Sequence, residues 1–191
     1  MEESYAVCFS GHRPEKLPDG GDMSSPAVRA VISIIYSEIE KRIADGANIF
    51  ITGMSRGVDL WAGEIAAEMK CSGRPIKLVA AMPYRGFTDS FTGREKWAAG
   101  FIMSNADIVY HISEAYEKDC MKKRNQFMVD HSSALIAVCK DSRSGTGQTI
   151  RMAQKKGIDV KIIDLAPFFA LSGLSEDELP VQYRSAPHFR F

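Results

Sequence analysis

Six short apolar segments alternate with longer amphipathic segments along most of this chain, and this alternation constrains the fold more than any other feature. The segments expected as strands are residues 5–9, 49–52, 76–81, 107–112, 134–139 and 160–163. Between the first two, apolar residues recur at helical spacing; they are Val28, Val31, Ile32, Ile35, Ile39 and Ile43. Alternation of this kind predicts βαβ units with right-handed crossovers. The sequence therefore predicts an α/β fold: a Rossmann-like, doubly wound, mostly parallel sheet in a single three-layer domain.

Local signals place the ends of these elements. Ser25-Pro26 pairs an N-cap residue with proline at the first helical position, and Gly46 ends that helix. Thr92-x-x-Glu95 has the spacing of a capping box for the third helix. Residues 134–139 are almost continuously apolar, which is typical of a central strand covered on both faces. We expect the domain to span residues 1–166 and a C-terminal arm to span 167–191, with a short helix near 175–179.

Composition limits the classes of function. The chain has 191 residues, of which 45% are hydrophobic, and its 24 basic and 24 acidic side chains give a formal net charge of zero. This balance disfavours a nucleic-acid partner, because such proteins usually carry a basic excess. The four cysteines show neither C-x-x-C nor zinc-ligand spacing, so no metal is expected. No basic leader and no membrane-length apolar run is visible, and we expect a cytoplasmic protein.

Three loops rich in small residues follow expected strands. They are residues 10–13 (SGHR), 53–57 (GMSRG) and 144–147 (SGTG). In a parallel sheet the ligand lies beyond the carboxyl ends of the strands, and helix N-termini there attract phosphate. The three loops together predict a cradle for phosphate oxygens, although each alone is equally typical of a tight turn. Neither G-x-G-x-x-G nor a Walker lysine is present, so dehydrogenase and P-loop chemistry are not supported.

Charged residues near these loops have two interpretations each. Asp59 either interacts favourably with the helix dipole or accepts hydrogen bonds from ribose hydroxyls or a metal-bound water. Glu64 lies off the helical face of Asp59, so the two form no convincing catalytic pair. Arg13 and Arg56 either bind phosphate or are simply solvated. His12 is a proton donor, a phosphate ligand or simply a hydrogen-bond partner for the backbone. No catalytic residue and no cofactor is assigned.

Three separate motifs carry a family resemblance. Residues 10–17 (SGHRPxKL), 53–64 (GMxxGVDLWAxE) and 124–130 (RNxxMVD) resemble the YpsA-like family of the SLOG superfamily. That superfamily unites Rossmann-like domains with the LOG phosphoribohydrolases and the DNA-processing protein DprA. The resemblance spans about residues 5–163 and implies a Rossmann-like fold with a nucleotide-type site. It also implies association into a homodimer, as in LOG-like and DprA-like relatives.

The predicted ligand-binding residues combine the loops with these motifs. They are Ser10, Gly11, His12, Arg13, Gly53, Met54, Arg56, Gly57, Asp59, Glu64, Arg124, Asn125, Asp130, Gly145 and Thr146. The chain departs from LOG enzymes in the third loop, where Gly147, Gln148 and Thr149 follow Thr146 and the catalytic glutamate is missing.

The sequence thus favours a sensor or regulatory protein that binds a nucleotide-type small molecule, such as ADP-ribose, NAD or a nucleoside phosphate. Two alternatives remain. One is a hydrolase that cleaves an N-glycosidic or phosphate bond of a nucleotide, with Asp59 or Glu64 as base and Arg13 or Arg56 holding phosphate. The other is a single-stranded DNA-binding protein.

Overall fold

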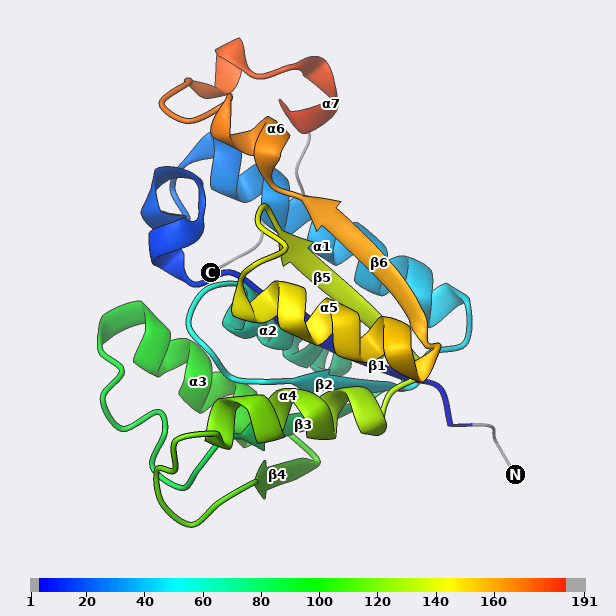
Figure 1. Ribbon diagram of the computed structural model, residues 1–191. Coiled ribbons are helices and arrows are strands. Elements are labelled where there is room, and N and C mark those ends of the chain that lie inside the picture. The colour runs from blue at the N-terminus through cyan, green and yellow to red at the C-terminus, as the bar shows by residue number, and fades with distance from the viewer. Residues whose placement is uncertain (1–3, 185–191) are drawn as a thin grey trace.

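All six expected strands form, and they pair into one parallel sheet in the computed structural model, which describes residues 4–184 (Figure 1). The strands are β1 (Ala6–Gly11), β2 (Ile49–Thr52), β3 (Lys77–Met82), β4 (Ile108–His111), β5 (Ala134–Cys139) and β6 (Asp159–Asp164). Their order across the sheet is β4-β3-β2-β1-β5-β6. The direction of winding reverses between β1 and β5, so the predicted doubly wound, Rossmann-like fold is confirmed.

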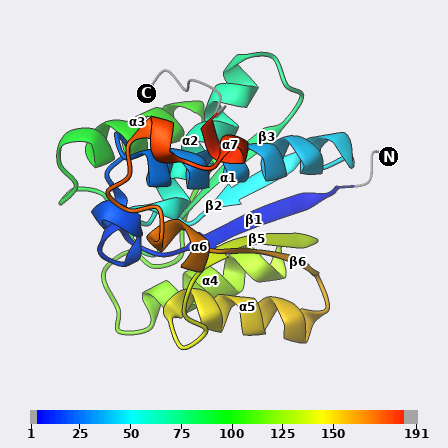
Figure 2. The ribbon, with the colours of Figure 1, turned by 90° about the horizontal axis from the view of Figure 1, so that it is seen from above.

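Helices cover both faces of the sheet (Figure 2). On one face lie α1 (Pro26–Ala44), α2 (Val58–Cys71) and α3 (Gly93–Asn105). On the other lie α4 (Cys120–Asp130) and α5 (Gly145–Lys156). Two short 3-10 helices, η1 (Pro14–Lys16) and η2 (Pro18–Gly21), follow β1. The structure is therefore the three-layer sandwich that the sequence predicts.

The core divides according to the period of two along each strand. In β1, Val7 and Phe9 join the core under α1 and α2, whereas Ala6 and Cys8 join the core under α4 and α5. All six residues of β5 are buried, which confirms its predicted central position. In contrast to β5, β4 lies at an edge of the sheet.

The helix-start signals were right in one case and wrong in another. The Ser25 hydroxyl accepts a hydrogen bond from the Val28 amide at 3.5 Å and caps α1 as expected. Thr92 directly precedes α3, but its side chain makes no cap hydrogen bond, so the predicted capping box is wrong. Glu95, its expected partner, faces Arg56 at 3.8 Å instead. Glu95 thus has a cation from the loop after β2 as its neighbour in place of the expected local contact.

The C-terminal arm crosses one end of α1 (Figure 1). It contains α6 (Ala166–Phe169), η3 (Glu176–Glu178) and α7 (Val181–Arg184). The predicted short helix corresponds to η3, where Ser175 and Glu178 form a capping box. Leu171 and Leu179 are buried in the same core as α1. Residues 1–3 and 185–191 lie outside the described part, and the division at residue 166 stays a prediction.

Candidate functional site

A cavity of about 480 Å³ lies where the winding of the sheet reverses. In open α/β sheets this crevice is the usual place for a ligand. Its lining comes from the end of β1 and the loop after it, the loop after β2, and the starts of α2, α4 and α5. The lining residues are Ser10, Gly11, His12, Arg13, Glu15, Lys16, Ser55, Asp59, Met121, Arg124, Asn125, Ser144, Gly145 and Thr146. We call this cavity the switch-point pocket.

The loop after β1 is held in place by His12. Its Nε2 accepts a hydrogen bond from the Lys140 amide at 3.1 Å, which ties this loop to the segment after β5. Burial, followed by the nearby Lys16 charge, lowers the pKa of the His12 imidazole below its ordinary value. The ring is therefore neutral near pH 7, and its one proton sits on Nδ1. The structure thus gives His12 a backbone partner as well as a place in the pocket.

The loop after β2 supplies the floor. Thr52 Oγ1 donates to the Asp59 carbonyl at 2.6 Å and accepts from the Met54 amide at 3.2 Å. Gly57 has φ of 83° and ψ of −128°, a conformation that side chains rarely adopt. A Cβ there would also lie 2.6 Å from the His12 carbonyl oxygen. Glycine at 57 is therefore required by the close approach of two loops.

Asp59 and Arg124 form a buried pair beneath the pocket. The Arg124 Nη1 and Asp59 Oδ2 are 3.4 Å apart, and each side chain is 5% exposed. Arg124 also donates to the Gly53 carbonyl and, through Nη2 at 3.0 Å, to Ser55 Oγ. Burial raises the pKa of the Asp59 carboxyl, and Arg124 together with the Ser55 and Gly11 amides opposes that rise. This pair joins α4 to the loops after β1 and β2.

The N-terminus of α5 forms the remaining wall. Ser144 Oγ caps the helix by accepting from the Gly147 amide at 3.2 Å. Gly145 and Thr146 occupy the first turn and line the pocket. Amides of a first helical turn have no partner within the helix, and the helix dipole is positive there. Asn125 Nδ2 donates to Thr149 Oγ1 at 2.9 Å and so fixes α4 against α5.

The structure brings nine of the fifteen predicted residues together in the lining. They are Ser10, Gly11, His12, Arg13, Asp59, Arg124, Asn125, Gly145 and Thr146. Gly53 and Met54 lie behind the lining, Gly53 as a partner of Arg124 and Met54 as a fully buried side chain. Gly57 lines a second cavity, on the other face of the sheet.

Three predicted residues have other neighbours. Arg56 pairs with Glu15, at 2.5 Å between Nη2 and Oε1, and does not line the pocket. Glu64 faces the second cavity and pairs with Arg94. Asp130 lies at the far end of α4 and accepts from Gln126 at 2.8 Å. The ion pairs of Arg56 and Glu64 join residues 41 and 30 positions apart in the chain, which sequence spacing could not show. The place of Glu64 off the face of Asp59, by contrast, follows from helical spacing.

Five lining residues were not among the predicted ligand-binding residues: Ser55, Lys16, Glu15, Met121 and Ser144. The hydroxyl of Ser55 within a glycine-bounded loop was the available signal. Among residues 4–184, no group of three His, Cys, Asp or Glu side chains is placed to hold a metal ion. Within the same described residues, no helix is both long and apolar enough to cross a membrane.

Comparison with known proteins decides the family. Residues 7–166 match the YpsA family model, described as the YspA SLOG family. The chain belongs to the YpsA family of the SLOG superfamily. This YpsA-family chain is 30% identical over 154 residues to a UPF0398 protein of Bacillus cereus strain B4264, covering 79% of the chain and 83% of the relative. A UPF0398 protein of Bacillus thuringiensis strain Al Hakam is 29% identical over 152 residues, covering 78% and 82%.

Two solved structures share the fold. DNA processing protein A (DprA) from Streptococcus pneumoniae superposes with a TM-score of 0.56 at 19% identity, covering 87% of this chain and 53% of its own. DprA from Helicobacter pylori, whose structure is described as showing a single-stranded DNA binding mode, gives 0.54 at 20% identity, covering 83% and 64%. The YpsA-family chain therefore spans about half to two thirds of the length of these structures.

Proposed function

We propose that the switch-point pocket binds a nucleotide or nucleotide-derived ligand, such as ADP-ribose, NAD or a nucleoside phosphate, through its phosphate groups. The observation that carries this proposal is the first turn of α5, whose Gly145 and Thr146 open into a cavity rimmed by Arg13 and Lys16. Free amides, a helix dipole and two cations together suit a phosphate. The cavity volume of about 480 Å³ is in the range of small-molecule sites.

The placement of the two candidate base residues, Asp59 and Glu64, favours a sensor or regulatory role without turnover over hydrolysis. Asp59 is committed to Arg124 and two backbone amides, so it is poorly placed to accept a proton from water. Glu64, the other proposed base, faces a different cavity. A ligand bound at the first turn of α5 would contact the loops that follow three strands. Through these contacts, ligand binding would change the conformation of loops at the protein surface.

Thermal denaturation with a panel of ADP-ribose, NAD and AMP tests the proposal. Ligand at about 100 times its Kd stabilises a protein by about 2.7 kcal/mol, which is a clear rise in melting temperature. Chromatography of the same incubations separates binding from cleavage. A stabilised protein with unchanged ligand supports a sensor, and released base or phosphate supports the hydrolase. No shift with any member of the panel contradicts the proposal.

Single-stranded DNA is the second candidate. The fold shared with DprA and the basic rim formed by Arg13 and Lys16 favour it, although the net charge of zero opposes it. Binding of this kind weakens steeply with salt, because phosphate contacts release counterions. Fluorescence anisotropy of a labelled oligonucleotide at low and high salt decides between the two candidates. Association into a homodimer stays a prediction, which sedimentation analysis checks.

A further inference from the structure

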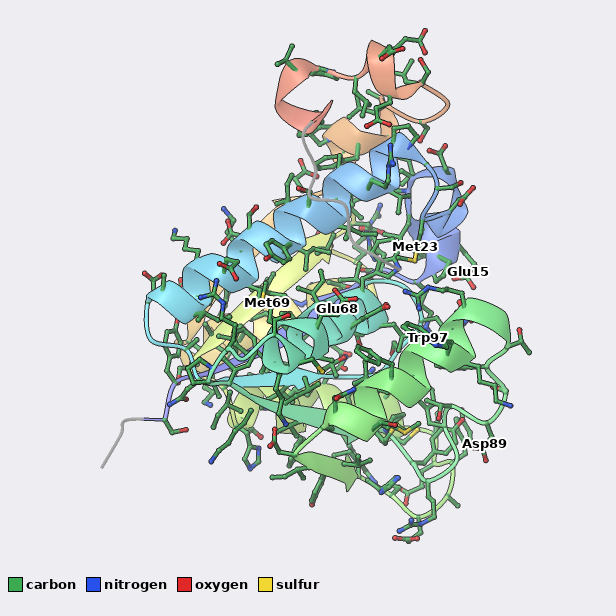
Figure 3. The ribbon with its side chains drawn as sticks, turned by 180° about the vertical axis from the view of Figure 1, so that it is seen from behind. Glu15, Met23, Glu68, Met69, Asp89 and Trp97 are labelled. Carbon is green, nitrogen blue, oxygen red and sulfur yellow. The ribbon has the colours of Figure 1, made fainter. Side chains whose placement is uncertain are left out.

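A second cavity, of about 540 Å³, lies on the face of the sheet that α1, α2 and α3 cover. Most of its wall is apolar, formed by Met23, Ile32, Leu60, Trp61, Ala98 and Leu179. Figure 3 shows this face, with Met23 on the loop before α1 and Trp97 on α3. No lining residue is shared with the switch-point pocket. We call it the helical-face cavity.

One charged side chain in this wall is buried with an oxygen that has no protein partner. Glu64 is 1% exposed, and its Oε1 accepts from Arg94 Nη2. Its Oε2 has no hydrogen-bond partner among the described residues. A buried acceptor left unpaired destabilises the protein, and more so when it is charged. A ligand N–H that reaches Oε2 from the cavity would supply the missing donor.

The C-terminal arm forms the outer side of the cavity. Leu179 and Tyr183 line it, and Glu176 pairs with Arg29 of α1 at 2.6 Å across the rim. Tyr183 also packs on Phe168, with ring centroids 5.4 Å apart. The lining also includes Asp22 and Glu95, and apolar walls with a small number of polar groups are the usual composition of a small-molecule site.

We propose that the helical-face cavity is a second ligand site, for a planar and mostly apolar molecule that donates an N–H hydrogen bond to Glu64 Oε2. Heteroaromatic compounds with an amino group beside a ring nitrogen belong to this class. Apolar walls bury the ring, Glu64 selects for the donor, and Arg94 holds the carboxylate in place from α3. This inference does not depend on the function proposed for the switch-point pocket.

Calorimetric titration with 2-aminobenzimidazole tests the site. The matched probe is 1-methylbenzimidazole, which has the same ring system without an N–H donor. The aminated probe should bind saturably and at least about tenfold more tightly, which corresponds to about 1.4 kcal/mol. In a Trp97→Phe protein the remaining tryptophan is Trp61, so quenching of its fluorescence on titration places the probe in this cavity.

Variants separate Glu64 from its surroundings. Glu64→Gln keeps an acceptor for Arg94 but turns an amide donor toward the cavity, and it should weaken the aminated probe at least about tenfold. Glu68→Gln is the control, because Glu68 is a half-buried carboxylate on the same helix outside the lining. If Glu64→Gln does not fold, Ala98→Leu fills part of the cavity with Glu64 intact and should abolish binding.

Four outcomes would overturn the proposal. They are no saturable binding of the aminated probe, equal affinity for both probes, unchanged affinity in the folded Glu64 or Ala98 variant, and displacement of the probe by ADP-ribose. The last outcome would place the probe in the switch-point pocket. Since ADP-ribose binding is measured separately by thermal denaturation, failure here leaves the function proposed for the switch-point pocket standing.

Discussion

Arg124 on α4 and Asp59 on α2 meet 3.4 Å apart beneath the switch-point pocket, although 65 positions separate them in the chain. Both are buried, and Arg124 adds bonds to Gly53 and Ser55. Two sequence motifs are thereby joined in one interaction. The pair fixes the floor on which a ligand would rest, so its loss should damage both stability and binding.

Replacing Asp59 with alanine should lower the free energy of unfolding by about 3–5 kcal/mol, because the Arg124 charge is left buried without its counterion. Urea denaturation measures the loss. The control is Asp141→Ala, which removes an exposed ion pair with Arg143, 3.7 Å long, together with the hydrogen bond from the Arg143 amide, and it should destabilise the protein much less than Asp59→Ala does. Similar losses in the two variants would contradict the buried-pair account.

Stability should fall as the pH drops below 6.5, with His12 contributing to the fall. Burial lowers the pKa of His12 below its ordinary 6.5, so the unfolded chain binds a proton that the folded chain resists. The penalty is absent above pH 6.5 and grows as the pH falls from 6.5 toward the lowered folded pKa. Urea midpoints measured across this range should decline less in His12→Gln. An equal decline would show that His12 carries no such penalty.

Gly57→Ala should destabilise more than Gly73→Ala. Both glycines have positive φ, 83° and 89°, and each substitution pays about 1–3 kcal/mol of backbone strain. A Cβ at 57 also meets the His12 carbonyl oxygen at 2.6 Å, whereas a Cβ at 73 meets nothing within 4 Å. The difference in melting temperature between the two variants, measured by thermal denaturation, reports the contribution of the close approach between the two loops. Equal losses would mean that the loops separate freely.

Arg13→Ala and Lys16→Ala should each weaken ADP-ribose binding about tenfold, because each removes a cation from the pocket rim. Calorimetry gives the affinities, and raising the salt concentration should narrow the difference from the unaltered protein. Lys118→Ala, an exposed lysine outside the lining, serves as the control. If the control weakens binding as much as the two rim variants do, a general charge effect explains the result.

Local pattern predicted the fold well, because apolar segments alternate with amphipathic ones along the chain and two helices, α1 and α5, begin at a serine cap. The three loops were also placed correctly, since parallel strands bring their carboxyl ends to one edge. Contacts between residues distant in the chain could not be predicted from the sequence. Glu64 lies in the same motif as Asp59, but its offset of five residues on α2 turns it toward another cavity, where it pairs with Arg94 of α3, a partner that the sequence did not show. Likewise, nothing in the sequence pairs Arg56 with Glu15.

A crystal structure of the protein soaked with ADP-ribose tests the central claim most directly. The account predicts phosphate density against the Gly145 and Thr146 amides, within reach of Arg13 or Lys16. Phosphate density elsewhere, or an empty switch-point pocket at a saturating ligand concentration, would contradict it.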